Sequence, residues 1–170
     1  MAKTSRGTTG VRPLIAALFM GCLAISWPSR AEPLTDAVRV MALNMYHEAR
    51  GEGLRGMVAV GWVVLNRMAD PAYPDTVREV VYQGCQFSWV CDRRSDRPRD
   101  ARAWRRAVQL AAALLRERVP DPTRGALWYH ASRIKRPNLG SPVTTVARIG
   151  RHVFYARAGR PIPPLVVASR

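Results

Sequence analysis

The chain has 170 residues, which fits one domain at the usual size of about 100–200 residues. Lysine and arginine outnumber aspartate and glutamate by 27 to 12, so the formal net charge is +15 at pH 7. That charge favours an acidic partner, although much of it can be arginine solvated on helix surfaces. The sequence has no internal repeat and no low-complexity stretch, which excludes a repeat architecture.

The first 31 residues have the three-part layout of a secretory signal peptide. A basic start without acidic residues precedes an apolar run over 14–25, and small residues lead to a cleavage point after Ala31. The run is shorter than the roughly 20 residues that a membrane-spanning helix needs. Lipid attachment at Cys22 is the alternative. Both alternatives predict a protein exported to the periplasm or cell envelope. No stable membrane span is expected once the signal is removed, and nucleic acid is not an expected partner in that compartment.

Helical patterns fill the first part of the mature chain. A helix is predicted over 34–50, with Thr35 or Asp36 as its N-cap, and an almost uniformly apolar one over 54–68. After two prolines, Thr76 begins a short helix, with a glutamate three residues further on at capping-box spacing.

A longer helix is predicted from Asp100, as its N-cap, to Arg118, and the two prolines that follow end it. Its apolar side chains recur at helical spacing and are expected to face the core. This stripe consists of Trp104, Val108, Ala111 and Leu115.

Two cysteines, Cys85 and Cys91, belong to the mature chain. An even pair in an oxidising compartment predicts a disulfide. The bond would close a loop of seven residues and fix the shape of the segment 83–92. Two unpaired thiols are the alternative.

The last third is rich in aromatic and β-branched residues. Its predicted strands cover 126–131, 144–149 and 152–156. Gly150 and Arg151 form the expected turn between the last two. Helices followed by a small antiparallel β element predict an α+β fold with the sheet at one side, over a domain of residues 32–158. Residues 159–170, with three prolines, are predicted to be a loose tail.

Glu48 is the candidate catalytic residue. It follows Val38, Met41 and Met45 at spacings of three and four, so it lies at the end of an apolar helix face. Partial desolvation there raises the pKa of a carboxyl group, as a general acid acting near neutral pH requires. The alternative is a structural ion pair between this carboxylate and a nearby arginine. The candidate partners are Arg50, Arg55 and Arg67.

Several short motifs follow one another along the chain. They are Tyr46–Glu52, Gly56–Val60, Val64–Arg67, Tyr73–Thr76, Gln86–Ser88, Gly125–Ala131 and Ile149–Tyr155. In this order they resemble the spore-cortex-lytic (SleB/CwlJ-type) cell wall hydrolase family, and the resemblance runs from about residue 37 to 157. Met57 and Tyr73 depart from the family, which often has Gln and Phe at these positions.

The resemblance implies a lysozyme-like α+β fold and cleavage of peptidoglycan between N-acetylmuramic acid and N-acetylglucosamine. It places the catalytic acid at Glu48 and the second acid of the motif at Glu52, which we expect at the cleft rim. Tyr129 and His130, at a strand end, are further candidates for substrate contact. Gln86 and Phe87, held by the disulfide loop, are candidates of the same kind.

One acid suffices if the acetamido group of the substrate attacks its own anomeric carbon, so a lytic transglycosylase or a muramidase is expected. We expect a monomer that acts on the polymeric glycan with no cofactor and no metal. Two alternatives stay open. One is a non-catalytic envelope-binding module, which has no need of a carboxyl group with a raised pKa. The other is a zinc-dependent amidase that uses His47, His130 and His152.

Overall fold

The computed structural model describes residues 35–136 and 138–162. The predicted signal segment, with Cys22 and the cleavage point, lies outside the described residues, as does most of the predicted tail. Among the residues described, no helix is both long and apolar enough to cross a lipid bilayer.

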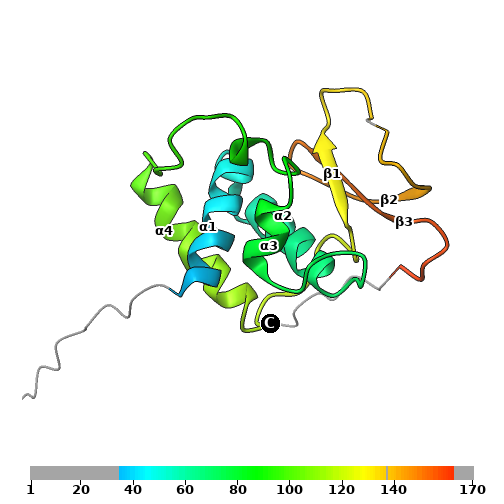
Figure 1. The fold of residues 1–170 in the computed structure, drawn as a ribbon, viewed down its shortest axis with the longest axis horizontal. Helices are drawn as coiled ribbons and strands as arrows, with labels where there is room; N and C mark the ends of the chain where they lie inside the picture. The colour runs from blue at the N-terminus through cyan, green and yellow to red at the C-terminus, as the bar shows by residue number, and fades with distance from the viewer. Residues whose placement is uncertain (1–34, 137, 163–170) are drawn as a thin grey trace, which may run out of the picture. The chain divides into compact units, whose positions relative to one another are not determined.

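Helices come first along the chain and strands last, and Figure 1 shows the helices gathered beside a small sheet. The helices are α1 (Asp36–Ala49), α2 (Gly53–Met68), α3 (Val77–Tyr82), the 3₁₀ helix η1 (Ser88–Val90) and α4 (Ala101–Leu114). The strands are β1 (Trp128–Ala131), β2 (Val143–Ile149) and β3 (His152–Arg157). The predicted α+β class is confirmed.

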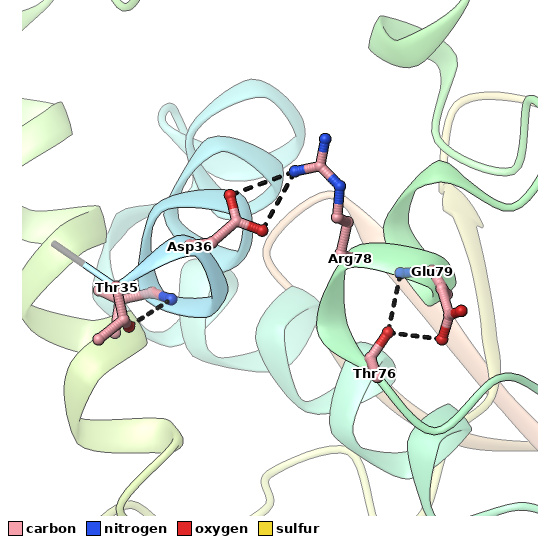
Figure 2. A network of polar contacts seen from close by, with 6 residues as sticks. Thr35, Asp36, Thr76, Arg78 and Glu79 are labelled. Atoms are coloured by element: carbon pink, nitrogen blue, oxygen red, sulfur yellow. Dashed lines mark hydrogen bonds and ion pairs between the residues drawn. The ribbon is translucent and has the colours of Figure 1, made fainter.

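Side chains cap three helices where the sequence predicts it. The Thr35 hydroxyl accepts a hydrogen bond from the Val38 amide at 3.3 Å, and the Thr76 hydroxyl accepts one from the Glu79 amide at 3.2 Å (Figure 2). Asp100 accepts from two amides at the start of α4, each at 2.9 Å. These bonds satisfy amides that have no partner inside the helix, so each fixes where a helix begins.

An exposed ion pair also links α3 to α1 (Figure 2). The Arg78 guanidinium donates to both carboxylate oxygens of Asp36, at 3.1 and 3.2 Å. Because both side chains are exposed, this pair contributes only about 0–1 kcal/mol to stability.

Helix α1 lies at the centre of the main core, in contact with the other three α-helices. Val40, Met41 and Met45 are fully buried there. A side chain at Gly61 of α2 would collide with Leu114 of α4 and press against Met45, so this glycine permits the close approach of α2 to its neighbours.

Helix α4 differs from its prediction in length and in the face it buries. It ends at Leu114 rather than Arg118, and Glu117 has a left-handed φ of 55°. The helix turns small residues toward α1, since small side chains allow close helix packing. The buried positions are Ala103, Ala107, Ala111 and Leu114, whereas Trp104, Val108 and Leu115 are only partly buried.

The strands form an antiparallel sheet in the order β1–β3–β2. The predicted turn connects β2 to β3, and Gly150 there has a φ of 56°. A second core cluster joins the sheet to α2, through Ala59 and Val63 of the helix and Phe154 of β3. This packing fixes the position of the sheet against the helices and therefore shapes the cleft described next.

Candidate active site

A cleft of about 1320 Å³ is lined by the end of α1, the disulfide loop, the segment 92–100, β1 and the β2–β3 turn. All six side chains predicted to act on substrate line it. They are Glu48, Glu52, Gln86, Phe87, Tyr129 and His130. The volume exceeds the roughly 300–1,000 Å³ of ordinary small-molecule pockets, which favours a polymeric ligand.

Glu48 is partly buried in this cleft near the end of α1. Its Oε2 accepts a 3.0 Å hydrogen bond from the Tyr129 hydroxyl, and the Ser88 amide donates a second bond to its carboxylate. Burial raises the pKa of Glu48, and the two hydrogen bonds offset only part of that increase. The carboxyl group therefore keeps its proton to a higher pH than an exposed glutamate, as a general acid requires.

The described residues do not show the alternative role for Glu48, a structural ion pair with a nearby arginine. None of their ion pairs includes Glu48. The Arg50 guanidinium lies over the Tyr46 ring at 5.2 Å, and the Arg67 guanidinium donates to the Leu127 carbonyl at 2.8 Å. The Glu48 carboxyl group is thus held by uncharged donors, which leaves its raised pKa in place.

Tyr129 connects the catalytic candidate to the sheet. Burial, followed by the negative charge of Glu48 and the hydrogen bond to it, raises the pKa of Tyr129 well above its ordinary value. The phenol therefore stays protonated and remains a donor. Its ring packs on His152 and Phe154, with centroids 5.0 and 5.5 Å away, which holds the hydroxyl in place.

Arg67 of α2 is a cleft residue to which the sequence reasoning gave no site role. Its side chain is only 4% exposed, and its guanidinium lies 5.3 Å from the ring centroids of both Tyr73 and Phe87. Its Nη1 has no hydrogen-bond partner among the described residues. The sequence does carry a signal, because an arginine in a helix that is otherwise almost uniformly apolar needs a specific environment when it is buried.

Glu52 has a different environment from Glu48. Its Oε1 accepts from Arg151 Nε and its Oε2 accepts from the Arg151 amide, both at 2.7 Å. Burial alone would raise the pKa of Glu52, but these hydrogen bonds and the Arg151 charge lower it below its ordinary value. A side chain at Gly150 would collide with the Glu52 carboxylate, so glycine is needed at this turn. Glu52 thus ties the start of α2 to the β2–β3 turn.

The predicted disulfide between Cys85 and Cys91 is confirmed. The loop that it closes contains η1, from which the Ser88 amide reaches Glu48. Phe87 lines the cleft but is only 2% exposed, and its ring packs near that of Tyr129, so its contact with substrate stays a prediction. The disulfide therefore constrains a loop that contributes directly to the environment of the candidate acid.

Two tryptophan contacts hold the same loop against α1. Trp89 donates from Nε1 to the Asn44 side-chain oxygen at 2.9 Å. Its ring stacks on His47, with centroids 4.8 Å apart and planes 17° apart. These contacts lie within the buried part of the fold, since Trp89 is only 5% exposed.

The three histidines make separate contacts. His47 bonds through Nε2 to the Asp96 carbonyl at 3.1 Å. His130 lies 2.9 Å through Nδ1 from the Ala131 carbonyl and 3.0 Å through Nε2 from the Tyr155 hydroxyl. A carbonyl only accepts, so Nδ1 carries a proton and donates it to the Ala131 carbonyl. Both ring nitrogens of His130 are occupied, and its contact with substrate stays a prediction.

His152 faces Tyr129, and burial lowers its pKa. Its Nδ1 is buried without a hydrogen-bond partner among the described residues. Over residues 35–136 and 138–162, no group of three His, Cys, Asp or Glu side chains is placed to hold a metal ion.

Known proteins similar to this chain include spore cortex-lytic enzymes and a cell wall hydrolase. The spore cortex-lytic enzyme of Halalkalibacterium halodurans is 35% identical over 117 residues, which cover 69% of this chain and 34% of that protein. The Bacillus subtilis spore cortex-lytic enzyme is 30% identical, with 69% and 36% covered. The chain therefore spans about a third of these relatives. The cell wall hydrolase CwlJ of B. subtilis is 30% identical, and 83% of it is covered.

Solved structures show the same fold. The catalytic domain of the Bacillus cereus SleB protein matches with a TM-score of 0.57 and 26% identity, over 75% of this chain and 98% of that domain. The catalytic domain of the germination-specific lytic transglycosylase SleB from Bacillus anthracis matches with a TM-score of 0.56 and 27% identity, over 74% and 98%. The expected lysozyme-like fold is confirmed.

The sequence profile of the Cell Wall Hydrolase family matches residues 51–155, which is more than half of the chain. Glu48 lies just before the matched range, and Glu52 lies inside it. Together with the relatives above, this match shows that the chain belongs to the Cell Wall Hydrolase family.

Proposed function

We propose that this protein cleaves the glycan strands of peptidoglycan between N-acetylmuramic acid and N-acetylglucosamine, in the periplasm or cell envelope. Family membership supports the substrate. The observation that carries the proposal is the environment of Glu48, a partly buried carboxyl group with a raised pKa in a large cleft. A protonated carboxyl group in such a position can donate to a glycosidic oxygen near neutral pH.

In the proposed reaction Glu48 first acts as an acid. Its proton passes to the glycosidic oxygen, the bond from that oxygen to the anomeric carbon of muramic acid breaks, and the acetamido oxygen of the same sugar bonds to that carbon. The Glu48 carboxylate that results accepts hydrogen bonds from the Tyr129 hydroxyl and the Ser88 amide. These donors stabilise the negative charge as it develops.

Glu48 then acts as a base. The 6-hydroxyl of the muramic acid attacks its anomeric carbon, the bond to the acetamido oxygen breaks, and the hydroxyl proton returns to Glu48. The product is a 1,6-anhydro sugar, and the cycle consumes no water. Attack by water instead of the 6-hydroxyl would give a hydrolysed end and a muramidase.

The engagement of Glu52 by Arg151 supports a substrate-assisted reaction over one that uses two carboxylates. Classical glycosidases pair an acid with a second carboxylate that serves as nucleophile or base. Here both oxygens of Glu52 are occupied by Arg151, so this carboxylate is not free to activate water or attack carbon. A substrate-assisted reaction needs no second carboxylate, whether the 6-hydroxyl or water completes it.

Mass spectrometry of fragments released from purified sacculi tests the proposal, with Glu48→Gln as the inactive control. Fragments that end in 1,6-anhydro-muramic acid are expected. Fragments with reducing ends would instead identify the protein as a muramidase. Release of free peptides from an intact glycan would identify the protein as an amidase, provided that a chelator abolishes the activity and zinc restores it.

A further inference from the structure

Four exposed arginines line the same cleft as Glu48. We call them the arginine rim: Arg94, Arg97, Arg99 and Arg133. The first three lie between η1 and α4 and the fourth lies just beyond β1, so they come from two parts of the chain that are distant in sequence. Their guanidinium groups make no ion pair or hydrogen bond with any residue in the described part of the chain.

The other arginines of the cleft are already engaged. Arg151 is bonded to Glu52, Arg67 to the Leu127 carbonyl, and Arg50 to the His47 carbonyl at 3.5 Å. The rim is therefore where the cleft offers cationic donors to a ligand.

Acidic side chains do not cancel this charge. Seven arginines and five acidic residues line the cleft. Glu52 is neutralised by Arg151, and Glu48 is uncharged in the form that begins the proposed reaction. The cleft thus keeps an excess of positive charge beside the site of cleavage, and its unpaired guanidinium groups favour carboxylate ligands, which they can bind through two parallel hydrogen bonds.

We propose that the arginine rim binds the carboxylates of the peptide stems, so that the preferred substrate is stem-bearing glycan rather than bare glycan. This inference rests on the proposed function. The sugars of a glycan strand are largely uncharged, and the stems on its muramic acid residues carry the carboxylates. A strand in the cleft with a muramic acid at Glu48 brings a stem to the cleft walls, where the rim lies.

Binding and cleavage are measured on two forms of purified, phosphate-free sacculi: native, and with stem carboxyls converted to amides. Binding is measured by co-sedimentation in a Glu48→Gln background, so that no cleavage occurs. The rim variant combines Arg94→Gln, Arg97→Gln and Arg133→Gln. A control with the same charge change combines Arg39→Gln, Arg105→Gln and Arg116→Gln, three exposed arginines that do not line the cleft.

The rim variant should bind native sacculi about 10–100-fold more weakly than its parent, at roughly 2–5-fold for each of the exposed charge pairs lost. It should bind amidated sacculi as the parent does. The control should match the parent on every form. The parent itself should prefer native to amidated sacculi by a similar factor, and this preference should shrink in high salt, where charges are screened.

Equal binding of the parent to native and amidated sacculi would overturn the inference. So would a control that loses as much as the rim variant, since the effect would then be one of net charge. If the parent binds strongly only to sacculi that keep their phosphate polymers, the ligand of the rim is phosphate instead of a carboxylate. A parent with Glu48 intact that releases no glycan from any form would refute the proposed function alone, because the binding comparison does not depend on cleavage.

Discussion

The Tyr129 hydroxyl donates a 3.0 Å hydrogen bond to Oε2 of Glu48, across 81 positions of the chain. The bond connects strand β1 to the end of helix α1 and fixes the carboxyl group within the cleft. It also favours the charged form of Glu48, against the burial that raises its pKa. The same contact thus positions the acid and limits how far its pKa rises.

Replacing Glu48 with Gln should abolish nearly all turnover, because the amide keeps the size of the side chain but has no transferable proton. General acid catalysis contributes about 10²–10⁴-fold, so release of fragments from sacculi should fall by at least that range. The melting temperature should stay close to that of the parent. A folded Glu48→Gln protein that cuts glycan at the parent rate would disprove the assignment.

Tyr129→Phe should shift the pH dependence of activity. Glu48 must be protonated to act as an acid, so activity is lost as pH rises through its pKa. Removing the hydroxyl removes a bond that favours the carboxylate, so that pKa rises and the alkaline limb of kcat/KM should move to higher pH. We also expect kcat/KM to fall roughly 10–100-fold, as for a lost hydrogen bond to a charged group. Tyr82→Phe, outside the cleft, should change neither, and an unmoved limb in Tyr129→Phe would argue against this coupling.

Glu52→Gln should act mainly on stability. The variant weakens two charge-assisted bonds to Arg151, which should cost about 1–3 kcal/mol in the free energy of unfolding. In the parent the pKa of Glu52 is lowered on folding, so its contribution is present above the ordinary pKa and is lost as pH falls through the lowered one. Unfolding in denaturant at pH 7 and at acid pH should show this loss in the parent and not in the variant. Glu117→Gln, at an exposed turn, is the control. A Glu52→Gln protein of parental stability without activity would instead make Glu52 catalytic.

Replacing Cys85 and Cys91 with Ser should loosen the loop that carries the Ser88 amide. Chain entropy for a loop of this size predicts a loss of about 2 kcal/mol in the free energy of unfolding. Weaker donation from the Ser88 amide should raise the pKa of Glu48 and shift the alkaline limb of activity to higher pH. Chemical denaturation and a pH–rate profile measure the two effects, and reduction of the parent should reproduce both. Unchanged values in both measurements would show that the loop keeps its shape without the bond.

Local interactions account for what the sequence determined by itself. Thr35, Thr76 and Asp100 each bond an amide within three residues, so the helix starts are specified by a few neighbouring side chains. The order of helices and strands likewise follows from local periodicity. The disulfide is predictable because the predicted removal of the signal segment leaves a single pair of cysteines.

Only the tertiary structure decided the partners of the charged and buried groups. Arg67 meets the Leu127 carbonyl 60 positions away, and Glu52 meets Arg151 99 positions away. Neither pairing follows from spacing, because it depends on how the sheet packs on α2. The predicted stripe of α4 holds in part for the same reason: Ala111 is buried and Trp104 packs on the core only partly buried, whereas close contact with α1 selects the alanine face. The sequence by itself identifies the candidate acid, Glu48. The packing of distant segments determines which donors surround it, and it leaves Glu48 without an ion pair while Glu52 is paired with Arg151.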